Sequence, residues 1–150
     1  MKSLEIRSAR PEDRASWFAL RRALWPGDEA DHAREIEAHL ARTDERWPQE
    51  ALLAFLDGEP VGLAEVSVRP YAEGCETRDV GYLEGWFVTE AARQGGVGRA
   101  LIEAAEAWAR EQGCVEMASD AEPENEGSLA AHLACGFRDA GLVRCFAKRL

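Results

Sequence analysis

Residues 80–101 read VGYLEGWFVTEAARQGGVGRAL, and this stretch predicts how the chain builds its functional site. Residues 80–88 are apolar on both faces of a strand except at Glu84, which is typical of the centre of a sheet. A glycine-rich turn follows, and apolar residues at helical spacing then predict a helix over about 96–112, which Gly113 ends. The chain therefore passes from a buried strand through a tight turn into a helix.

The turn between this strand and this helix has the properties of an anion-binding site. Backbone N–H groups at a helix N-terminus have no partner within the helix, and the helix dipole is positive there. Gly95, Gly96 and Gly98 allow the backbone to approach an anion closely. The turn lacks the Gly-Lys-Ser/Thr of a Walker A loop and the glycine spacing of the Rossmann fingerprint. We therefore expect a phosphate-binding turn of another kind.

Outward from this stretch, hydrophobic periodicity predicts the element order β-α-α-β-β-β-α-β-α-β. The predicted strands lie at residues 4–8, 51–56, 61–68, 80–88 and 114–118, with a last strand or hairpin at 137–149. The predicted helices lie between Pro11 and Trp25 and at residues 28–42, 96–112 and 126–134. Antiparallel strands come first and strand–helix–strand crossovers follow, so we expect one mixed α/β domain over residues 1–150.

The composition excludes several classes of protein. The chain carries 28 acidic and 18 basic residues, a formal net charge of −10, whereas a nucleic-acid binder usually has a basic face. The sequence contains no run of 18 apolar residues and no apolar h-region near its start, so we expect no membrane partner and a cytoplasmic location. Its four cysteines, Cys75, Cys114, Cys135 and Cys145, form no CxxC and have no histidine at metal-ligand spacing. We expect reduced thiols and no metal.

The motif Arg93-x-x-Gly96-x-Gly98 resembles the Arg/Gln-x-x-Gly-x-Gly/Ala signature of the GNAT acetyltransferases. The resemblance implies a mixed, mostly antiparallel central sheet flanked by helices, with acetyl-CoA as the co-substrate. It assigns the pantetheine contacts to the strand and the pyrophosphate contacts to the turn, with one asparagine downstream. The residues so assigned are Trp86, Phe87, Val88, Arg93, Gln94, Gly95, Gly96, Val97, Gly98, Arg99 and Asn125.

Further strings resemble the aminoglycoside 6′-N-acetyltransferases within this superfamily. They include LWPG at 24–27, LEG-x-FV at 83–88, ASD at 118–120 and PEN at 123–125, and the similarity covers about residues 4–149. This resemblance implies that Trp25, Tyr71, Glu84 and Asp120 bind the drug, and that the protein is a homodimer. It also shows two departures, because Gly141 replaces an acidic drug-binding position and Phe146 stands where tyrosine can occur.

The physical properties of the substrate agree with these residues. An aminoglycoside carries several ammonium groups, which carboxylates on the walls of a cleft can hold. Glu84 is an isolated charge in an apolar strand, which is costly without a partner or a function. Glu84 is the first candidate for the base that deprotonates the amine, and Asp120 is the second. The alternatives are an ion pair of Glu84 with a nearby arginine, a turn or cap role for Asp120, and simple packing of Trp25 and Tyr71.

The resemblance also suggests an acid for the leaving thiolate. Many members of the superfamily place a tyrosine four residues before the Gly136-Phe137 position, where this chain has His132. An imidazole can protonate a thiolate near neutral pH. The alternative is a histidine that packs on the helix face against the turn.

The sequence leaves two other functions open. The same cofactor turn serves GNAT enzymes that acetylate polyamines or protein amines, because only the acceptor cleft differs. A protein that binds acetyl-CoA or a cationic drug without turnover would also keep the turn.

Overall fold

The computed structural model describes residues 2–42 and 47–150, so residues 1 and 43–46 of the predicted domain lie outside the described part. It contains one five-stranded sheet with the spatial order β1-β2-β3-β4-β5. The strands are β1 (Leu4–Ser8), β2 (Gln49–Leu56), β3 (Glu59–Arg69), β4 (Val80–Val88) and β5 (Met117–Ser119). The first four run antiparallel to their neighbours, and β5 is parallel to β4. The predicted mixed, mostly antiparallel sheet is confirmed.

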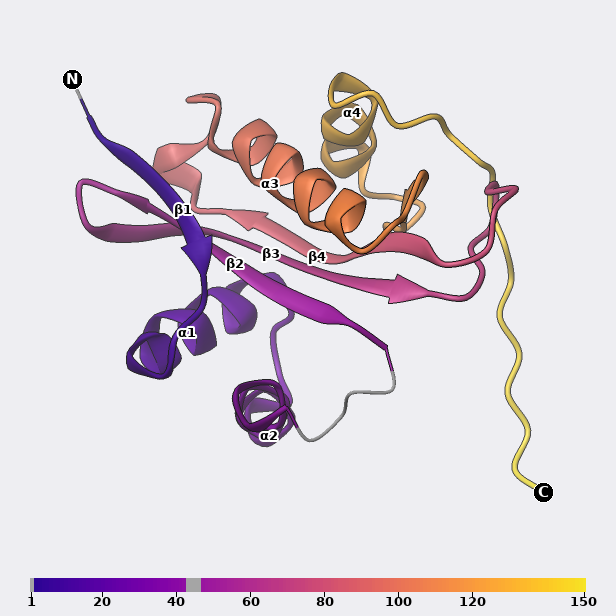
Figure 1. Cartoon of the computed structure of the whole chain (residues 1–150), viewed down its shortest axis with the longest axis horizontal. Coiled ribbons are helices and arrows are strands. Elements are labelled where there is room, and N and C mark those ends of the chain that lie inside the picture. Colours follow the sequence, from indigo (N-terminus) through magenta and orange to yellow (C-terminus); the bar gives the residue numbers. More distant parts are fainter. Residues whose placement is uncertain (1, 43–46) are drawn as a thin grey trace.

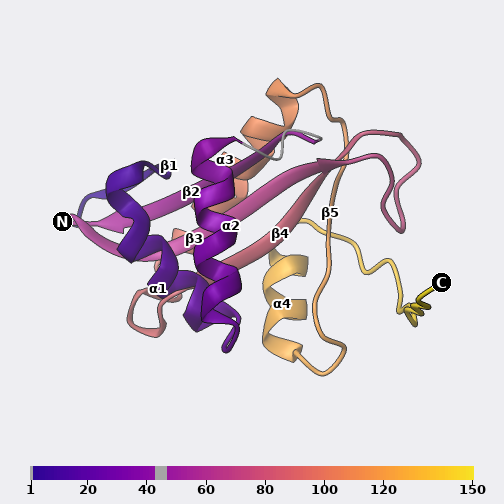
Figure 2. The same ribbon diagram turned by 90° about the horizontal axis from the view of Figure 1, so that it is seen from below.

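Helices cover both faces of the sheet (Figure 1). They are α1 (Arg14–Leu24), α2 (Glu29–Ala41), α3 (Val97–Glu111) and α4 (Glu126–Ala134), with 3₁₀ turns at Pro11–Asp13 and Glu90–Ala92. Helices α1 and α2 lie on one face, and α3 and α4 lie on the other (Figures 1 and 2). Pro11 begins the first 3₁₀ turn, where its missing N–H has no cost.

The apolar core consists of two layers, one on each face of the sheet. Leu101, Ile102 and Ala105 of α3 pack on the β2–β3–β4 face, whereas Trp17 and Leu20 of α1 pack on the opposite face. Helix α3 lies close to β3 because Gly62 has no side chain, and a Cβ there would lie 2.9 Å from Leu101 Cδ1. This close packing fixes the start of α3 against the centre of the sheet.

Strand β4 has two irregularities that shape the site. Glu65 pairs with Gly85 and Val66 pairs with Leu83, so Glu84 is an extra, bulged residue in β4. On the other side of β4, pairing with β5 ends at Leu83 and Ser119, whereas β4 continues to Val88. From Glu84 onward, the described residues therefore provide no β-ladder partner on that edge of β4.

The prediction for the C-terminal residues was wrong. Residues 137–149 form no strand; the chain contacts the loop between β3 and β4 at Arg138 and Ala140 and then runs away from the body as an extended arm (Figures 1 and 2). A strand needs hydrogen bonds from a neighbour, and no strand among the described residues supplies them. Leu142, Val143 and Phe146 are exposed as a result, Phe146 to 88%.

Two smaller predictions are also corrected. The strand expected at 114–118 begins only at Met117, because Gln112 and Gly113 still hydrogen-bond to the last turn of α3. The apolar spacing of residues 28–42 predicts Ala33 and Ile36 on the packed face of α2, but this face contains His32 and Ile36, and Ala33 is exposed. His32 takes the buried place because its ring accepts a hydrogen bond from the Arg21 side chain and donates one to a carbonyl, as described below.

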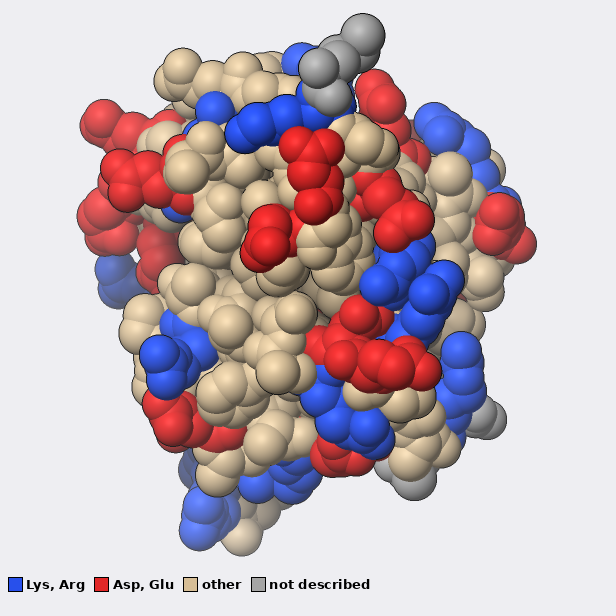
Figure 3. Space-filling model, turned by 90° about the vertical axis from the view of Figure 1, so that its left-hand side faces the viewer, with Lys and Arg blue, Asp and Glu red and all other residues tan. Residues whose placement is uncertain are grey.

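The surface carries charges of both signs. Acidic and basic side chains are interspersed on the face drawn in Figure 3, with no large patch of one sign. Among the described residues, no helix is long and apolar enough to cross a membrane, and no group of three or more His, Cys, Asp or Glu is placed to hold a metal ion. All four cysteines are free thiols.

We expect Val66→Ala to lower the free energy of unfolding by about 1–3 kcal/mol, because it removes two methyl groups from a packed site. Val66 is 1% exposed, whereas Val115 is 77% exposed, so Val115→Ala is the matched control. Urea denaturation at one protein concentration measures both changes. Equal effects of the two substitutions would contradict the assignment of the core.

Candidate active site

The turn before α3 presents backbone groups to solvent. Gly96 is the N-cap of α3 and has no side chain to bond the first N–H groups of the helix. Gln94, Gly95 and Gly96 are exposed, and φ is +65° at Gln94 and +85° at Gly96. A Cβ built on Gly96 meets no atom within 4 Å, so the space beside the helix N-terminus is open. The turn therefore fits a diphosphate, as the sequence predicts.

Side chains behind the turn hold it in place rather than face that space. Val97 is buried, and Trp86 Nε1 donates a hydrogen bond of 3.2 Å to the Gly98 carbonyl. Arg93 Nε donates to the Val88 carbonyl at 2.9 Å, and its guanidinium lies 5.7 Å from the centre of the Phe87 ring. Of these residues, Val97 and Gly98 can offer an anion only their backbone.

Two of the predicted cofactor contacts have structural partners at helix α4. Arg99 donates a hydrogen bond of 2.6 Å to the Ala134 carbonyl at the end of α4. Asn125 is the N-cap of α4, and its side chain accepts a hydrogen bond from the Ser128 N–H at 3.0 Å. The Arg99 bond links the end of α4 to the turn, whereas the Asn125 bond caps α4 itself. The cofactor roles of both residues stay predictions.

Glu84 and Asp120 belong to one hydrogen-bonded network. Glu84 accepts hydrogen bonds from Ser67 Oγ at 2.7 Å and from both Arg69 Nε, at 2.8 Å, and Arg69 Nη2. The Arg69 guanidinium lies 3.5 Å from the centre of the Tyr82 ring, and the Tyr82 hydroxyl donates to Asp120. The network contains two carboxylates and one guanidinium, which leaves one net negative charge beside the end of β5.

The physical state of this network follows from its contacts. Burial of the phenol, together with the hydrogen bond to Asp120, raises the pKa of Tyr82, so Tyr82 stays a protonated donor. The hydrogen bond to Glu84 raises the pKa of Arg69, which stays charged. Both Glu84 oxygens are engaged, whereas Asp120 is exposed and, among the described contacts, accepts its hydrogen bond from Tyr82 on Oδ2 only. The arginine partner considered for Glu84 in the sequence is therefore Arg69.

The turn between α1 and α2 covers the bulge in β4. Trp25 lies over Gly85, where a Cβ would come within 2.5 Å of Trp25 Cη2. His32 stacks on Trp25, and its Nε2 lies 2.8 Å from the Trp25 carbonyl, to which it must donate. The His32 Nδ1 then accepts a hydrogen bond from Arg21 Nε at 3.2 Å. Trp25 therefore covers Gly85, the neighbour of Glu84 in β4, and His32 of α2 holds Trp25 in this position.

Tyr71 lies on the loop between β3 and β4 and is 62% exposed. The negative charge of Glu73 raises the pKa of Tyr71, so its hydroxyl stays protonated. The same loop contacts the start of the C-terminal arm, because Arg138 donates to the Gly74 carbonyl at 2.9 Å. Tyr71 has the exposure that a ligand contact requires.

His132 lies on α4 with its ring between two aromatic side chains. The ring contacts Trp86 and Phe137 edge to face, each with a centroid distance of 5.2 Å. Its Nε2 lies 2.8 Å from Ser119 Oγ, and its Nδ1 lies 2.7 Å from the Ser128 carbonyl. The histidine thus packs against Trp86 of β4 rather than against the turn, and it also reaches the end of β5.

An acidic cavity of about 280 Å³ adjoins this network on the side of α1 and α2. Its carboxylates are Glu35, Glu50, Glu65 and Glu84. Arg21 forms an ion pair with Glu65, which also accepts a hydrogen bond of 2.8 Å from Trp17 Nε1.

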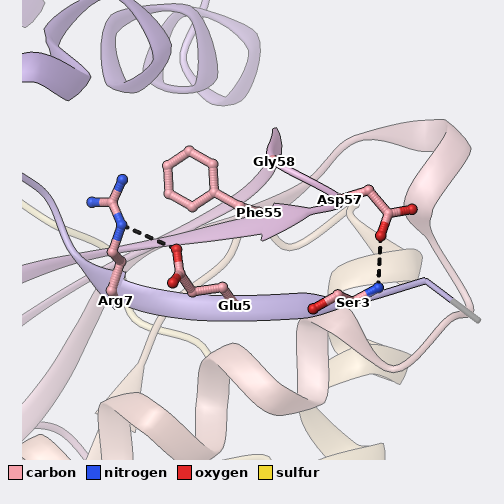
Figure 4. Close-up of a pocket in the computed structure, with 6 residues that line it drawn as sticks. All are labelled: Ser3, Glu5, Arg7, Phe55, Asp57 and Gly58. Atoms are coloured by element: carbon pink, nitrogen blue, oxygen red, sulfur yellow. Dashed lines mark hydrogen bonds and ion pairs between the residues drawn. The ribbon is translucent and has the colours of Figure 1, made fainter.

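A second hollow lies at the edge of β1 and β2, where Arg7 lies 4.4 Å from the Phe55 ring and pairs with Glu5 (Figure 4). That hollow contains none of the predicted site residues.

Sequence reasoning missed Ser67, Arg69, Tyr82 and Ser119. Arg69 is 15 positions from Glu84 in the sequence, and Tyr82 is 38 positions from Asp120. Only the strand register brings each pair together. The isolated charge of Glu84 in an apolar strand was the one signal that a partner existed.

The comparison with protein families gives the class of protein. The sequence model of the Acetyltransferase (GNAT) family matches residues 14–137. The chain belongs to this family, and GNAT acetyltransferases use acetyl-CoA.

Individual relatives are similar over nearly the whole chain. The aminoglycoside N(6′)-acetyltransferase type 1 of Klebsiella aerogenes is 48% identical over 147 residues, which covers 97% of this chain and 96% of that protein. A protein of the same name from Stenotrophomonas maltophilia is 44% identical over 142 residues, with coverage of 94% and 90%.

Solved structures are similar to the same extent. The apo structure of the aminoglycoside 6′-N-acetyltransferase AAC(6′)-Ig of Acinetobacter haemolyticus has a TM-score of 0.90 at 38% identity, covering 97% of this chain and 99% of that one. AAC(6′)-Iy in complex with the bisubstrate analogue CoA-S-monomethyl-acetylneamine has a TM-score of 0.92 at 37% identity, covering 99% of both chains.

We expect Gly96→Asp to weaken acetyl-CoA binding by about tenfold or more, because a carboxylate then occupies the open space and repels the diphosphate. Gly96→Asn separates the repulsion from the strain of a side chain at positive φ. Gly113→Asp is a second control, since Gly113 has φ +87° and open space at the other end of α3. Calorimetry measures the affinities, and an unchanged value for Gly96→Asp would contradict the role of the turn.

Proposed function

We propose that this protein transfers the acetyl group of acetyl-CoA directly to the 6′-amine of aminoglycosides, and so confers resistance to them. The relatives with 48% and 44% identity carry the name of this activity. The observation that carries the proposal is the Glu84–Arg69–Tyr82–Asp120 network with its net negative charge, next to the open edge of β4. A polycationic acceptor and an extended donor can meet there.

Successive segments of the chain bind successive parts of acetyl-CoA in this proposal. Acetyl-CoA supplies the acetyl thioester. We place the pantetheine arm along the free edge of β4 at Trp86, Phe87 and Val88, whose backbone groups have no ladder partner on that side. The turn from Arg93 to Arg99 holds the pyrophosphate, and Asn125, the N-cap of α4, is a further contact to CoA in this proposal. The backbone near Phe87 donates to the oxyanion of the tetrahedral intermediate.

The acceptor site uses the two carboxylates differently. An ammonium has a pKa of about 10 and must lose a proton before it attacks. Asp120 takes this role in our proposal, because none of the described groups binds its Oδ1, while Glu84 is bound on both oxygens. Glu84 then anchors an ammonium group, and Trp25 and Tyr71 form the walls of the cleft. Our proposal thus reverses the order of the two candidate bases given by the sequence, where Glu84 came first.

An acceptor comparison tests the function. Neomycin and paromomycin differ at the 6′ position, which carries an amine in the first and a hydroxyl in the second. We expect rapid thiol release from acetyl-CoA with neomycin and kanamycin, and little with paromomycin. Product analysis by NMR should place the acetyl group on the 6′ nitrogen. Preference for spermidine or an N-terminal peptide would instead favour an enzyme that acetylates polyamines or protein amines. Binding without turnover would favour a protein that only binds acetyl-CoA or a cationic drug.

We expect Glu84→Gln to raise the KM for the aminoglycoside by about tenfold or more while the KM for acetyl-CoA stays within about twofold, because it removes one charge from the acceptor wall. Asp120→Asn should instead lower kcat. Glu111→Gln, at the exposed end of α3, controls for the change in net charge. Wild-type kinetics of Glu84→Gln would remove this residue from the acceptor site.

We also propose that the protein is a homodimer, held together by the C-terminal arm. The arm exposes Leu142, Val143, Phe146 and Leu150, and no described element of its own chain covers them. The arm leaves the body at Gly141, whose φ of +102° suits a change of direction. The sheet ends in β5, a three-residue strand with a free edge. A second copy can cover an apolar, extended segment of this kind by pairing with it.

Sedimentation velocity tests the dimer. We expect the full chain to sediment as a dimer at micromolar concentration, and Phe146→Asp to sediment as a monomer because a buried charge at the interface is costly. Lys148→Asp is the control, since it changes charge in the same arm without placing a charge at an apolar position. A monomeric full chain would refute the proposal.

The reaction fits a cytoplasmic protein. Its acetyl donor, acetyl-CoA, is a thioester found inside the cell. The four cysteines are free thiols, as is usual in the reducing cytoplasm. We place the whole of residues 1–150 in a single acetyltransferase domain, of which the family match covers 14–137.

A further inference from the structure

The His132 ring has a defined tautomer. Its Nδ1 lies 2.7 Å from the Ser128 carbonyl oxygen, which can only accept, so Nδ1 must carry a hydrogen. In the neutral ring, Nε2 is then a bare acceptor, and among the described residues the donor that contacts it is the Ser119 hydroxyl at 2.8 Å. Trp86, Ser119, Ser128 and Phe137 face the ring, and none of these side chains is charged.

Ser119 stands at the point where β4 and β5 separate. It forms the last pair with Leu83, and its Oγ lies 3.4 Å from the Leu83 carbonyl as well as 2.8 Å from His132 Nε2. Beyond this pair, the edge of β4 is open. The Ser119 hydroxyl therefore joins the interior histidine to the beginning of the open edge.

Protonation of the ring reverses the direction of the Ser119 bond. An imidazolium carries a hydrogen on Nε2, which must donate to Ser119 Oγ, so the hydroxyl hydrogen turns away from the ring. The Leu83 carbonyl, at 3.4 Å, is too distant to hold that hydrogen strongly. The hydroxyl is then free to donate to a group at the open edge of β4.

We propose that Ser119 relays a proton from His132 to the thiolate that leaves acetyl-CoA, an inference that rests on the proposed acetyl transfer. As the C–S bond breaks, the Ser119 O–H proton goes to sulfur and the His132 Nε2–H proton goes to Ser119 Oγ. The products are a thiol, an intact serine and a neutral histidine. Of the two protons that the acceptor ammonium loses, one balances the proton given to sulfur, and the other goes to solvent. The imidazolium is restored from water.

Nitrogen NMR tests the geometry without turnover. In ¹⁵N-labelled free protein, His132 is assigned by the loss of its signals in His132→Phe, since the chain has only three histidines. We expect the neutral ring to be the Nδ1–H tautomer. Ser119→Ala should shift the Nε2 resonance and leave the Nδ1 resonance in place. An Nε2–H tautomer, or no shift in Ser119→Ala, would overturn the relay.

Steady-state kinetics tests the chemistry. We expect Ser119→Ala to lower kcat by about tenfold to a hundredfold while KM values stay within about threefold, as for loss of an acid that acts in the transition state. Ser119→Thr keeps a hydroxyl and should retain most of the activity. The double variant Ser119→Ala/His132→Phe should be no slower than the slower single variant, because both groups act in one chain.

Three outcomes would contradict the proposal. They are wild-type kcat in Ser119→Ala, failure of Ser119→Thr to restore kcat, and multiplicative losses in the double variant. These measurements use whichever amine the wild type acetylates best. A failure of the aminoglycoside proposal therefore shows in the choice of acceptor, whereas a failure of the relay shows only in the Ser119 variants.

Discussion

The separation of β4 from β5 after the Leu83–Ser119 pair is the constraint on which the site depends. Backbone N–H and C=O groups need partners, and a strand edge without a neighbour offers them to another extended chain. The bulge at Glu84 occurs at the same place in β4 and gives this residue a position outside the regular ladder. These two departures from sheet regularity thus place the open edge of β4, the Glu84 carboxylate and the His132–Ser119 pair around the same point of the sheet.

Charge is distributed so that the site attracts a cation without carrying an isolated buried carboxylate. Arg69 neutralises one of the two carboxylates in the network, and Tyr82 supplies a neutral donor to the other. A lone half-buried carboxylate would be costly, whereas this arrangement leaves a net attraction for an ammonium group. The acidic cavity next to the network extends the same field, while the face shown in Figure 3 mixes both signs.

Local patterns in the sequence predicted what depends on local interactions. The strand at 80–88 and the helix at 126–134 have the predicted bounds, because apolar runs, a capping asparagine and glycines mark them. The pairing of Glu84 with Arg69 could not be predicted, since it depends on a bulge and on the register between β3 and β4. The last segment was predicted as a strand or hairpin, but the partner that a strand requires is not encoded nearby. The functional roles of the site residues stay predictions, and our proposal changes only the order of the two candidate bases.

The hydrogen bond from Arg99 to the Ala134 carbonyl has a consequence for the stability of α4. Helix ends ordinarily fray with little cost, because their last carbonyls lack partners. Here a side chain from the first turn of α3 binds the last turn of α4. We therefore expect the opening of the two helix ends to be coupled, and the amides in the last turn of α4 to exchange more slowly than those of a free nine-residue helix.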